Sequence, residues 1–393
     1  MHILEIPSFF PPYGGEFCLE QAHALQVLGH EVRVLSNVQL SIKRSISEFI
    51  TLPYGRHWND MQGVAVYQSY MRGIPKVVRP NVRRWLKIVQ SMFREYVSRH
   101  GRPDVLHAHC CKWAGYAAML IAKEWGIPYV VTEHLSSMIF KEEFGEHFEN
   151  AWQIPMLKEA YARAHRVVMV AEEQADDLAP YFGKDYCMEV VSNIIDTDFF
   201  AYRRRQASAG RSFVFCCLAN FIPLKGYDVL FQAFESIRRQ GCEAKLIIAG
   251  MGTDSRGCSE MMASLVPSGG VEALGKIDRQ QVRDMLYRSD CMVLASRSEA
   301  QPLSLLEAMS TGLPVIATSC VPQSLRLEKA CCIVPIDDVL AMAEAMMKMC
   351  SETFADGEEA SRRVAQMASP SAVGKRLSEI LVEAAQQKGT SPS

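Results

Sequence analysis

Two carboxylates flank one predicted turn in the C-terminal half of the chain. An apolar run at 291–295 predicts a buried strand, and a predicted helix follows over about 303–311, which Gly312 would end. Glu299 lies before the turn that joins them, and Glu307 lies inside the helix. In an open parallel α/β sheet, ligands bind at the carboxyl ends of the strands, and the first turn of a helix offers N–H groups to phosphate. The turn therefore suits a diphosphate with hydroxyl-bearing groups on both sides, which describes a nucleotide sugar.

The backbone of this turn holds the candidate phosphate ligands. Pro302 has no N–H, so Gln301, Leu303 and Ser304 are expected to supply the amides that face phosphate. Glu307 lies about one helical turn further on, where it can accept hydrogen bonds from two neighbouring hydroxyls such as those of a ribose. The plain alternative is a strand–turn–helix with one surface glutamate and one capping glutamate.

The wider context of the two glutamates resembles the donor-site signature of the retaining GT-B glycosyltransferases of family 4. The resemblance rests on Glu-x7-Glu after a strand, followed by Ala-Met-x-x-Gly-x-Pro-Val-Ile-Ala-Thr at 308–318. It covers most of the chain and is densest over 220–318. It implies that Glu307 binds the ribose, that Glu299 binds hydroxyls of the donor sugar at the catalytic centre, and that no metal is needed.

A lysine follows the first apolar run of the C-terminal half. Lys225 comes after the apolar residues 213–218 and just before a predicted helix, where a cation can neutralise a leaving diphosphate. In the resembled family this lysine contacts the donor diphosphate with help from an arginine five residues earlier. This chain has Asn220 there, which can donate a hydrogen bond but carries no charge. Gly250, in a glycine turn, and Ile277, in a segment that resembles the one whose backbone meets the nucleotide base, complete the predicted donor site.

The N-terminal half begins with a predicted βαβ unit that lacks a Gly-x-Gly-x-x-Gly fingerprint, so a dinucleotide cofactor is not indicated. Its Gly14-Gly15 pair either forms a plain tight turn or lets the backbone approach a ligand. The sequence Pro-Pro-Tyr-Gly-Gly-Glu resembles the opening of the same family, in which the second glycine, here Gly15, lies near donor phosphate and acceptor.

A histidine follows another predicted strand of this half. His134 comes at the end of Val-Val-Thr-Glu-His, after an apolar strand, which again resembles the family pattern. We expect His134 near the reacting centre, as a catalytic residue. His107 and His109 are interpreted as structural side chains with satisfied hydrogen bonds.

Residues 72–102 are strongly basic and keep helical spacing of their apolar side chains. The alternatives are a solvated helix packed on a sheet and a surface that docks on anionic lipid. Because the apolar side chains are expected to face the protein, the charges, including Arg83, Lys87 and Arg94, would make the membrane contact.

Global features set the class of protein. The chain has 393 residues and a formal net charge of −2, which suggests two domains and does not argue for nucleic acid. The N-terminus does not resemble a signal peptide and no apolar run approaches the length of a membrane span, so a cytoplasmic location is expected. The thirteen cysteines are interpreted as buried free thiols.

Alternating strands and helices predict an α/β protein with two Rossmann-like domains facing a cleft, and the family resemblance implies that the fold is of GT-B type. The expected boundaries are 1–200 for an acceptor-binding domain, 201–369 for a nucleotide-sugar-binding domain, and 370–387 for a helix that crosses back to the first domain.

The predicted function is the transfer of a hexosyl unit, with retention, from a UDP- or GDP-linked sugar to a glycan or lipid-linked acceptor, in bacterial surface polysaccharide biosynthesis. No cofactor is expected. Two alternatives stay open: a nucleotide-sugar epimerase on the same fold, and a degenerate sugar-nucleotide binder, which Asn220 would favour.

Overall fold

The structure is a computed structural model that describes residues 1–144, 151–204, 211–327, 330–351 and 357–387. The chain forms two compact units. The first contains Met1–Ile194 together with the C-terminal segment that begins at Pro370, and the second contains Ile195–Ser369.

The first unit is built on an eight-stranded sheet with the order β3-β4-β2-β1-β5-β6-β7-β8. All neighbouring strands are parallel except β3 and β4. The strands are β1 (His2–Pro7), β2 (Glu31–Leu40), β3 (Arg56–Met61), β4 (Val64–Arg72), β5 (Val105–His109), β6 (Tyr129–Glu133), β7 (Arg166–Met169) and β8 (Met188–Val190). The central strands β1, β5 and β6 are buried along almost their whole length, as expected for parallel strands covered on both faces.

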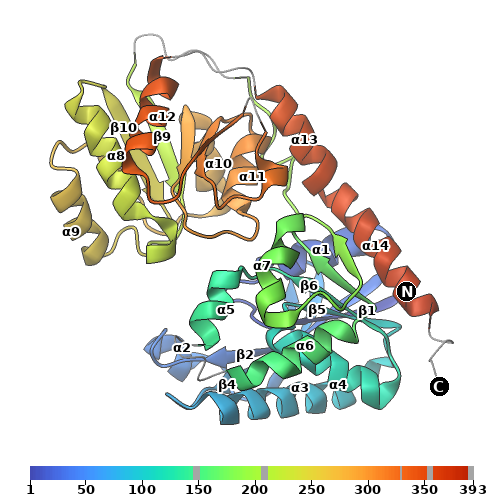
Figure 1. Ribbon diagram of the computed structural model, residues 1–393. Helices are drawn as coiled ribbons and strands as arrows, with labels where there is room; N and C mark the ends of the chain where they lie inside the picture. Colours follow the sequence, from blue (N-terminus) through green and yellow to red (C-terminus); the bar gives the residue numbers. More distant parts are fainter. Residues whose placement is uncertain (145–150, 205–210, 328–329, 352–356, 388–393) are drawn as a thin grey trace. The chain divides into compact units, whose positions relative to one another are not determined.

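Helices cover both faces of this sheet (Figure 1). The α-helices of the unit are α1 (Glu16–Val27), α2 (Ile46–Thr51), α3 (Val78–His100), α4 (Tyr116–Trp125), α5 (Ser137–Phe144), α6 (Ile154–Ala162), α7 (Glu172–Phe182) and α14 (Pro370–Gln386). One face packs against α3, α4 and α6, and the other packs against α1 and α14. The apolar side chains of α3, such as Trp85 and Phe93, are buried, while Arg83, Lys87 and Arg94 are exposed, as the sequence predicts.

The C-terminal helix α14 returns to the first unit and packs against α1 (Figure 1). Gly374 of α14 lies so close to Ala24 of α1 that a Cβ on the glycine would be 2.9 Å from the Ala24 Cβ. His30 Nε2 lies 2.7 Å from Ser378 Oγ, and Arg376 forms an ion pair of 2.7 Å with Glu189. The helix is therefore part of the first unit, as the predicted fold class requires.

A β-hairpin at one edge of the sheet was not foreseen. Strands β3 and β4 are antiparallel and are joined through Gln62 and Gly63, both of which have positive φ. Two successive residues with positive φ are the mark of the tight turns that join adjacent strands. The sequence feature that could have indicated it is the apolar run Val-Ala-Val-Tyr at 64–67, directly after a glycine.

The second unit contains a six-stranded parallel sheet with the order β11-β10-β9-β12-β13-β14. Its strands are β9 (Phe213–Leu218), β10 (Ala244–Ala249), β11 (Val271–Ala273), β12 (Cys291–Leu294), β13 (Val315–Thr318) and β14 (Cys331–Val334). Its α-helices are α8 (Tyr227–Arg239), α9 (Arg256–Leu265), α10 (Arg279–Arg288), α11 (Leu303–Ser310), α12 (Val339–Ser351) and α13 (Glu358–Ala368). Helices α8, α9 and α12 cover one face and α10, α11 and α13 the other.

No helix in the described ranges combines the length and the apolar character that a membrane span requires.

Candidate active site

The strand order of the second sheet places Lys225 and Glu299 next to each other. From β9 the chain moves outward to β10 and β11, then returns to the other side of β9 with β12. The segments that follow β9 and β12 therefore leave the sheet at neighbouring carboxyl ends, where the direction of winding reverses. Such a reversal opens a crevice for ligands in open α/β sheets. Lys225 ends the short 3-10 turn Pro223–Lys225 after β9, and Glu299 lies in the loop after β12.

The two side chains form an ion pair. Lys225 Nζ lies 2.6 Å from Glu299 Oε1, and the Ser296 hydroxyl donates to the same oxygen at 2.6 Å. The side chain of Glu299 retains only 9% of its exposure and that of Lys225 retains 21%. An ammonium group carries three N–H donors, so Lys225 can keep Glu299 as a partner and still donate to a phosphate oxygen.

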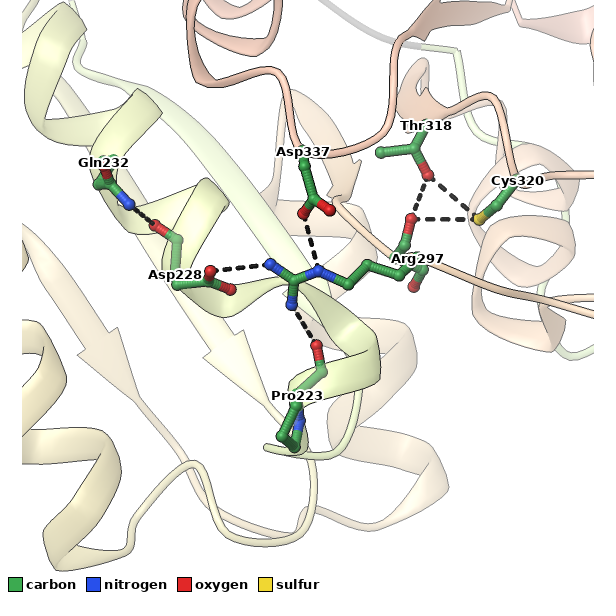
Figure 2. Close-up of polar contacts among 8 residues, drawn as sticks. Pro223, Asp228, Gln232, Arg297, Thr318, Cys320 and Asp337 are labelled. Atoms are coloured by element: carbon green, nitrogen blue, oxygen red, sulfur yellow. Dashed lines mark hydrogen bonds and ion pairs between the residues drawn. The ribbon is translucent and has the colours of Figure 1, made fainter. Parts of the chain in front are cut away.

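Arg297 joins the loop after β12 to the turn after β9. Figure 2 shows its guanidinium reaching Asp228, Asp337 and the carbonyl of Pro223. The distances are 2.8 Å to Asp228 Oδ2 and 2.7 Å to Asp337 Oδ1. The Arg297 backbone N–H also donates to the Leu224 carbonyl at 2.8 Å. Because one planar group holds several acceptors in a fixed geometry, Arg297 fixes the turn that carries Lys225 against the loop that carries Glu299.

The ion pair between Arg297 and Asp228 shifts the pKa of both side chains. Hydrogen bonding to Asp228 raises the pKa of Arg297. Burial acts to raise the pKa of Asp228, but the hydrogen bond and charge of Arg297 outweigh it, so the pKa of Asp228 is lowered.

On the other side of the loop, the Thr318 hydroxyl and the Cys320 thiol donate to the Ser296 carbonyl at 2.5 and 3.2 Å (Figure 2). The loop is thus held from both sides.

Asn220 and Gly250 link the ends of β9 and β10. The Asn220 Oδ1 accepts from the Met251 N–H at 3.0 Å, so the amide NH2 is the end of this side chain that could donate to a ligand. Gly250 has a φ of +140°, and a Cβ there would lie 2.1 Å from the Ala219 carbonyl oxygen. Only glycine permits this close approach of the two loops.

Ile277 lies in the loop between β11 and α10, and this loop is tied to the Gly250 turn. The Gly250 N–H donates to the Gly275 carbonyl at 2.9 Å, and the Gly275 N–H donates to the Thr253 hydroxyl at 3.0 Å. Ile277 and Leu303 both pack against the apolar cluster on the α10–α11 face of the sheet. The structure thus brings the segments after β9, β10, β11 and β12 to one edge of the second unit.

Helix α11 begins at Leu303, with Pro302 before it and without a side-chain cap. Pro302 and Gln301 are buried, whereas Leu303, Ser304 and Glu307 are partly exposed. The first N–H groups of a helix have no acceptor within the helix. The start of α11 is consequently suited to an anion, with Glu307 one turn away.

The first unit brings Gly15 and His134 to the same edge of its own sheet. Gly15 precedes α1 with a φ of +91°, and a Cβ there would lie 2.3 Å from the Phe9 carbonyl oxygen. His134 follows β6 and is partly exposed. The ring of Phe17, two residues after Gly15, stacks on the His134 ring with 3.8 Å between centroids.

Behind His134 lies a buried polar cluster. Glu5 Oε2 contacts His109 Nε2 at 2.5 Å and His107 Nδ1 at 2.9 Å, and all three side chains are almost completely buried. In the described part of the chain, these three residues form the one group whose potential metal-ligand atoms lie within 4.8 Å of one another. Both ring nitrogens of His109 have hydrogen-bond partners, as predicted, whereas His107 is bonded through Nε2 alone and its Nδ1 makes no hydrogen bond. Glu5 was missed. The sequence feature that could have identified Glu5 is its charge, because a charged residue is unusual inside the apolar run of a predicted central strand.

Arg297 was also missed by the sequence analysis, since an arginine beside Glu299 is unremarkable in one dimension. Its partners Asp228 and Asp337 lie 69 and 40 residues away. Only the fold brings the three side chains together, so no local pattern could have identified this arrangement. We call Arg297 with Asp228 and Asp337 the clamp.

Both halves of the chain match models of known protein families. Residues 14–193 match the model of the glycosyl transferase 4-like domain, and residues 212–352 match that of glycosyl transferases group 1. The chain is 25% identical over 339 residues to the putative teichuronic acid biosynthesis glycosyltransferase TuaC of Bacillus subtilis (strain 168), covering 81% of each protein. It is also 25% identical over 244 residues to the D-inositol 3-phosphate glycosyltransferase of Salinispora arenicola, covering 56% of this chain and 54% of that protein.

Solved structures share the whole fold. Sucrose-phosphate synthase from Thermosynechococcus elongatus superimposes with a TM-score of 0.80 at 16% identity, covering 98% of this chain and 99% of that one. Anabaena Alr3699/HepE, solved in complex with UDP and glucose, gives a TM-score of 0.71 at 15% identity, covering 97% and 100%. At these identities the likeness establishes the fold alone, whereas the two family models cover most of the sequence. The chain belongs to the group 1 glycosyltransferases with the GT-B fold.

Proposed function

We propose that the protein is a retaining glycosyltransferase of family 4 that moves a hexosyl unit from a nucleotide sugar to a glycan or lipid-linked acceptor. The observation that carries the proposal is the Lys225–Glu299 pair at the reversal point of the second sheet, beside the start of α11. A cation, a carboxylate and a helix N-terminus together fit a diphosphate that bears a sugar.

Each part of the donor then has a protein group to meet it. Lys225 and the first amides of α11 take the diphosphate, Glu307 takes the ribose hydroxyls, and Glu299 takes hydroxyls of the transferred sugar. Gly250 and Ile277 border the nucleotide, and Asn220 donates its amide to a phosphate oxygen. Gly15 and His134 are the contributions of the first unit, near the reacting centre. The donor base is uracil or guanine.

The proposed reaction forms a bond between the acceptor hydroxyl oxygen and the anomeric carbon. The bond between that carbon and the diphosphate oxygen breaks on the same face, and the acceptor proton passes to the departing diphosphate. Negative charge grows on the diphosphate as it leaves, so a nearby ammonium group and backbone amides stabilise the transition state more than the ground state. No metal ion is required for this charge balance.

Donor turnover tests the proposal. We expect release of nucleoside diphosphate from one member of a panel of UDP-, GDP- and ADP-sugars, in the presence of a lipid-linked acceptor and EDTA, with retained anomeric configuration in the product. We expect Lys225→Ala and Glu307→Ala to abolish turnover with little change in melting temperature. Lys245→Ala and Glu344→Ala, at exposed positions of the same unit, are the matched controls.

Three outcomes would contradict the proposal. New sugar isomers formed without an acceptor would indicate an epimerase. Donor binding without diphosphate release over a broad acceptor panel would indicate a degenerate binder. Full activity of Lys225→Ala or Glu307→Ala would refute the site.

TuaC is described as a teichuronic acid biosynthesis enzyme, which supports a surface polysaccharide precursor as the acceptor.

We also propose that the first unit docks on anionic lipid. Arg83, Arg84 and Lys87 are exposed on α3, and the segment before α3 exposes apolar residues, including Ile74 at 50%. Helix α2 exposes Ile46 at 63% and Ile50 at 66%. Basic side chains beside exposed isoleucines suit the surface of an acidic bilayer.

Arg72 connects α2 and the residues that follow it to α3. Its guanidinium donates to the carbonyls of Phe49 and Pro53 at 3.2 and 3.1 Å, and its own carbonyl accepts from Arg84 at 3.1 Å. We expect flotation with acidic liposomes at moderate salt, and loss of flotation when Arg83, Arg84 and Lys87 are replaced by Gln. Replacement of Arg362 and Arg363, exposed on α13 of the second unit, is the control. Equal flotation of all three proteins would remove the proposal.

A further inference from the structure

Two cysteines of the second unit lie in contact, on segments that are far apart in the sequence. Cys242 is in the turn between α8 and β10, and Cys350 is in the last turn of α12. Their Sγ atoms are 3.2 Å apart, although 108 positions separate the two residues. Both are free thiols with partly exposed side chains, whereas most of the thirteen cysteines are buried. An oxidant from solution can therefore reach this pair.

The position of Cys242 is fixed by the way in which α8 ends. The Gly241 N–H donates to the Arg238 carbonyl at 3.0 Å, and the Cys242 N–H donates to the Ile237 carbonyl at 3.1 Å. Gly241 has a φ of +86°. These two hydrogen bonds and the left-handed glycine form a Schellman motif, in which the second residue after the helix packs back on the helix. Cys242 is consequently held against the apolar cluster that α8 and α12 share.

A disulfide between the two cysteines requires only a small movement. The sulfur atoms of a disulfide are about 2.05 Å apart, so these two Sγ atoms would have to approach each other by about 1.2 Å. A metal ion would need more ligands than this pair offers. Within the described ranges, no group of three potential metal-ligand side chains includes either cysteine. The geometry therefore favours a site of two thiols.

We propose that Cys242 and Cys350 are a redox modification site, which forms a reversible disulfide with an oxidant of the hydroperoxide class, and that the native fold of the second unit accommodates this bond. In a reducing compartment the two residues stay thiols, and a disulfide that forms there is transient. The proposal concerns the second unit itself and does not depend on the identity of the transferred sugar or of the acceptor.

The reaction with hydrogen peroxide consists of two steps. The first thiol attacks one oxygen of the peroxide, which gives a sulfenic acid and one water. The second thiol then attacks the sulfenic sulfur, the bond between the Sγ atoms forms, and a second water leaves. The two thiols lose two electrons and two protons, and the peroxide is reduced to water. Burial and the neighbouring Cys242 raise the pKa of Cys350, so we assign the first step to Cys242, because the reactive form is the thiolate.

The disulfide would join two helices whose opposite ends are already joined by the clamp. Helices α8 and α12 pack against each other (Figure 1). Asp228 is the second residue of α8 and Asp337 lies just before α12, and Arg297 binds both. Each helix has 13 residues and is therefore about 20 Å long. Oxidation of Cys242 and Cys350 would thus add a covalent connection about 20 Å from the clamp.

Peptide mapping of the full-length protein tests the proposal. Cys187 is exposed and could link two molecules, so the experiments use a Cys187→Ser background. Trypsin releases the two cysteines in separate peptides, 240–245 and 349–362, each with one cysteine. After treatment with hydrogen peroxide and alkylation of the remaining thiols, we expect the two peptides to be joined, and dithiothreitol to separate them. Cys350→Ser should abolish the joined species, whereas Cys332→Ser, at a partly exposed position beside the same apolar cluster, should leave it.

Three mapping results would overturn the proposal. In the first, Cys242 and Cys350 are both recovered as alkylated free thiols while the partly exposed Cys320 is oxidised. In the second, Cys242 is converted to a sulfinic acid without a joined species. In the third, Cys350 is linked to a different cysteine.

Thermal unfolding supplies the second readout. A cross-link between residues 108 positions apart restricts the unfolded chain, so we expect the second unit to melt about 5 °C higher after oxidation than before. Cys350→Ser should melt at the same temperature before and after peroxide. A joined species that melts at or below the temperature of the reduced protein would show that the bond distorts the native unit, and would overturn the proposal. If Cys350→Ser does not fold, peptide mapping and melting of the Cys350-containing protein still decide the question.

Discussion

At the scale of single residues, the site depends on side chains that hold other side chains. Arg297 makes no proposed contact with a donor, yet it connects Asp228, Asp337 and the Pro223 carbonyl around the turn that carries Lys225. A guanidinium can serve these acceptors together because its donors lie in one rigid plane, whereas the ammonium group of lysine is a point charge on a flexible stem.

Arg297→Lys should therefore keep the charge but loosen the turn. We expect KM for the donor to rise several-fold, equivalent to about 1 kcal/mol, which is the usual scale of a lost hydrogen bond. The measurement is steady-state kinetics with the donor selected by the panel. Arg256→Lys, in an exposed pair with Glu260 on α9, is the control and should change little. An unchanged KM in Arg297→Lys would show that the clamp does not position Lys225.

Gly15 offers a second prediction at this scale. Gly15→Ala should destabilise the first unit, because the new Cβ would meet the Phe9 carbonyl oxygen at 2.3 Å and the φ of +91° is itself strained for alanine. Gly29→Ala is the matched control, since Gly29 has a φ of +84° but no atom within 4 Å of the new Cβ. We expect Gly29→Ala to lose about 1 kcal/mol and Gly15→Ala distinctly more, measured by urea unfolding. Equal losses would mean that the close contact is relieved by local movement.

At the scale of elements, helix α14 completes the core of the first unit although it comes last in the sequence. Its buried residues Val373, Leu377 and Ile380 join the same apolar cluster as Leu25 of α1. The small residues Gly374 and Ala24 let the two helix backbones approach closely.

Gly374→Leu should separate the two helices. We expect a loss of about 1–3 kcal/mol in unfolding free energy, the range for overpacking in a close-packed interior. Lys375→Leu, one residue later on the exposed face of α14, adds the same side chain without meeting α1 and should change stability by less than about 0.5 kcal/mol. Similar losses in both variants would contradict the close packing of α14 on α1.

At the scale of the whole molecule, the two units have separate cores and separate polar edges. The proposed donor groups other than Gly15 and His134 all belong to the second unit. A nucleoside diphosphate should therefore be recognised mainly by that unit, and its binding should be visible there.

Hydrogen exchange measured by mass spectrometry tests this division. Saturating UDP or GDP, whichever raises the melting temperature, should slow exchange in the segments 220–226 and 301–304, because a ligand that binds the folded state suppresses local opening. The matching nucleoside monophosphate should protect less, since it lacks the second phosphate. Protection confined to the first unit would contradict the assignment of the donor site.

The sequence by itself determined the alternation of strands and helices, the buried face of α3, and the turn that carries Glu299 and Glu307. These features follow from local periodicity and from turn residues, which act over a few neighbouring positions. It did not reveal the hairpin of β3 and β4 at the sheet edge, where the pattern is short.

Tertiary structure decided which distant groups meet. The pairing of Lys225 with Glu299 depends on β9 and β12 being neighbours in the sheet, although the two residues are 74 positions apart. The contact of Glu5 with His109 depends in the same way on β1 lying beside β5. Side-chain contacts between strands follow from strand order, and strand order is set by the packing of the whole unit rather than by any local pattern.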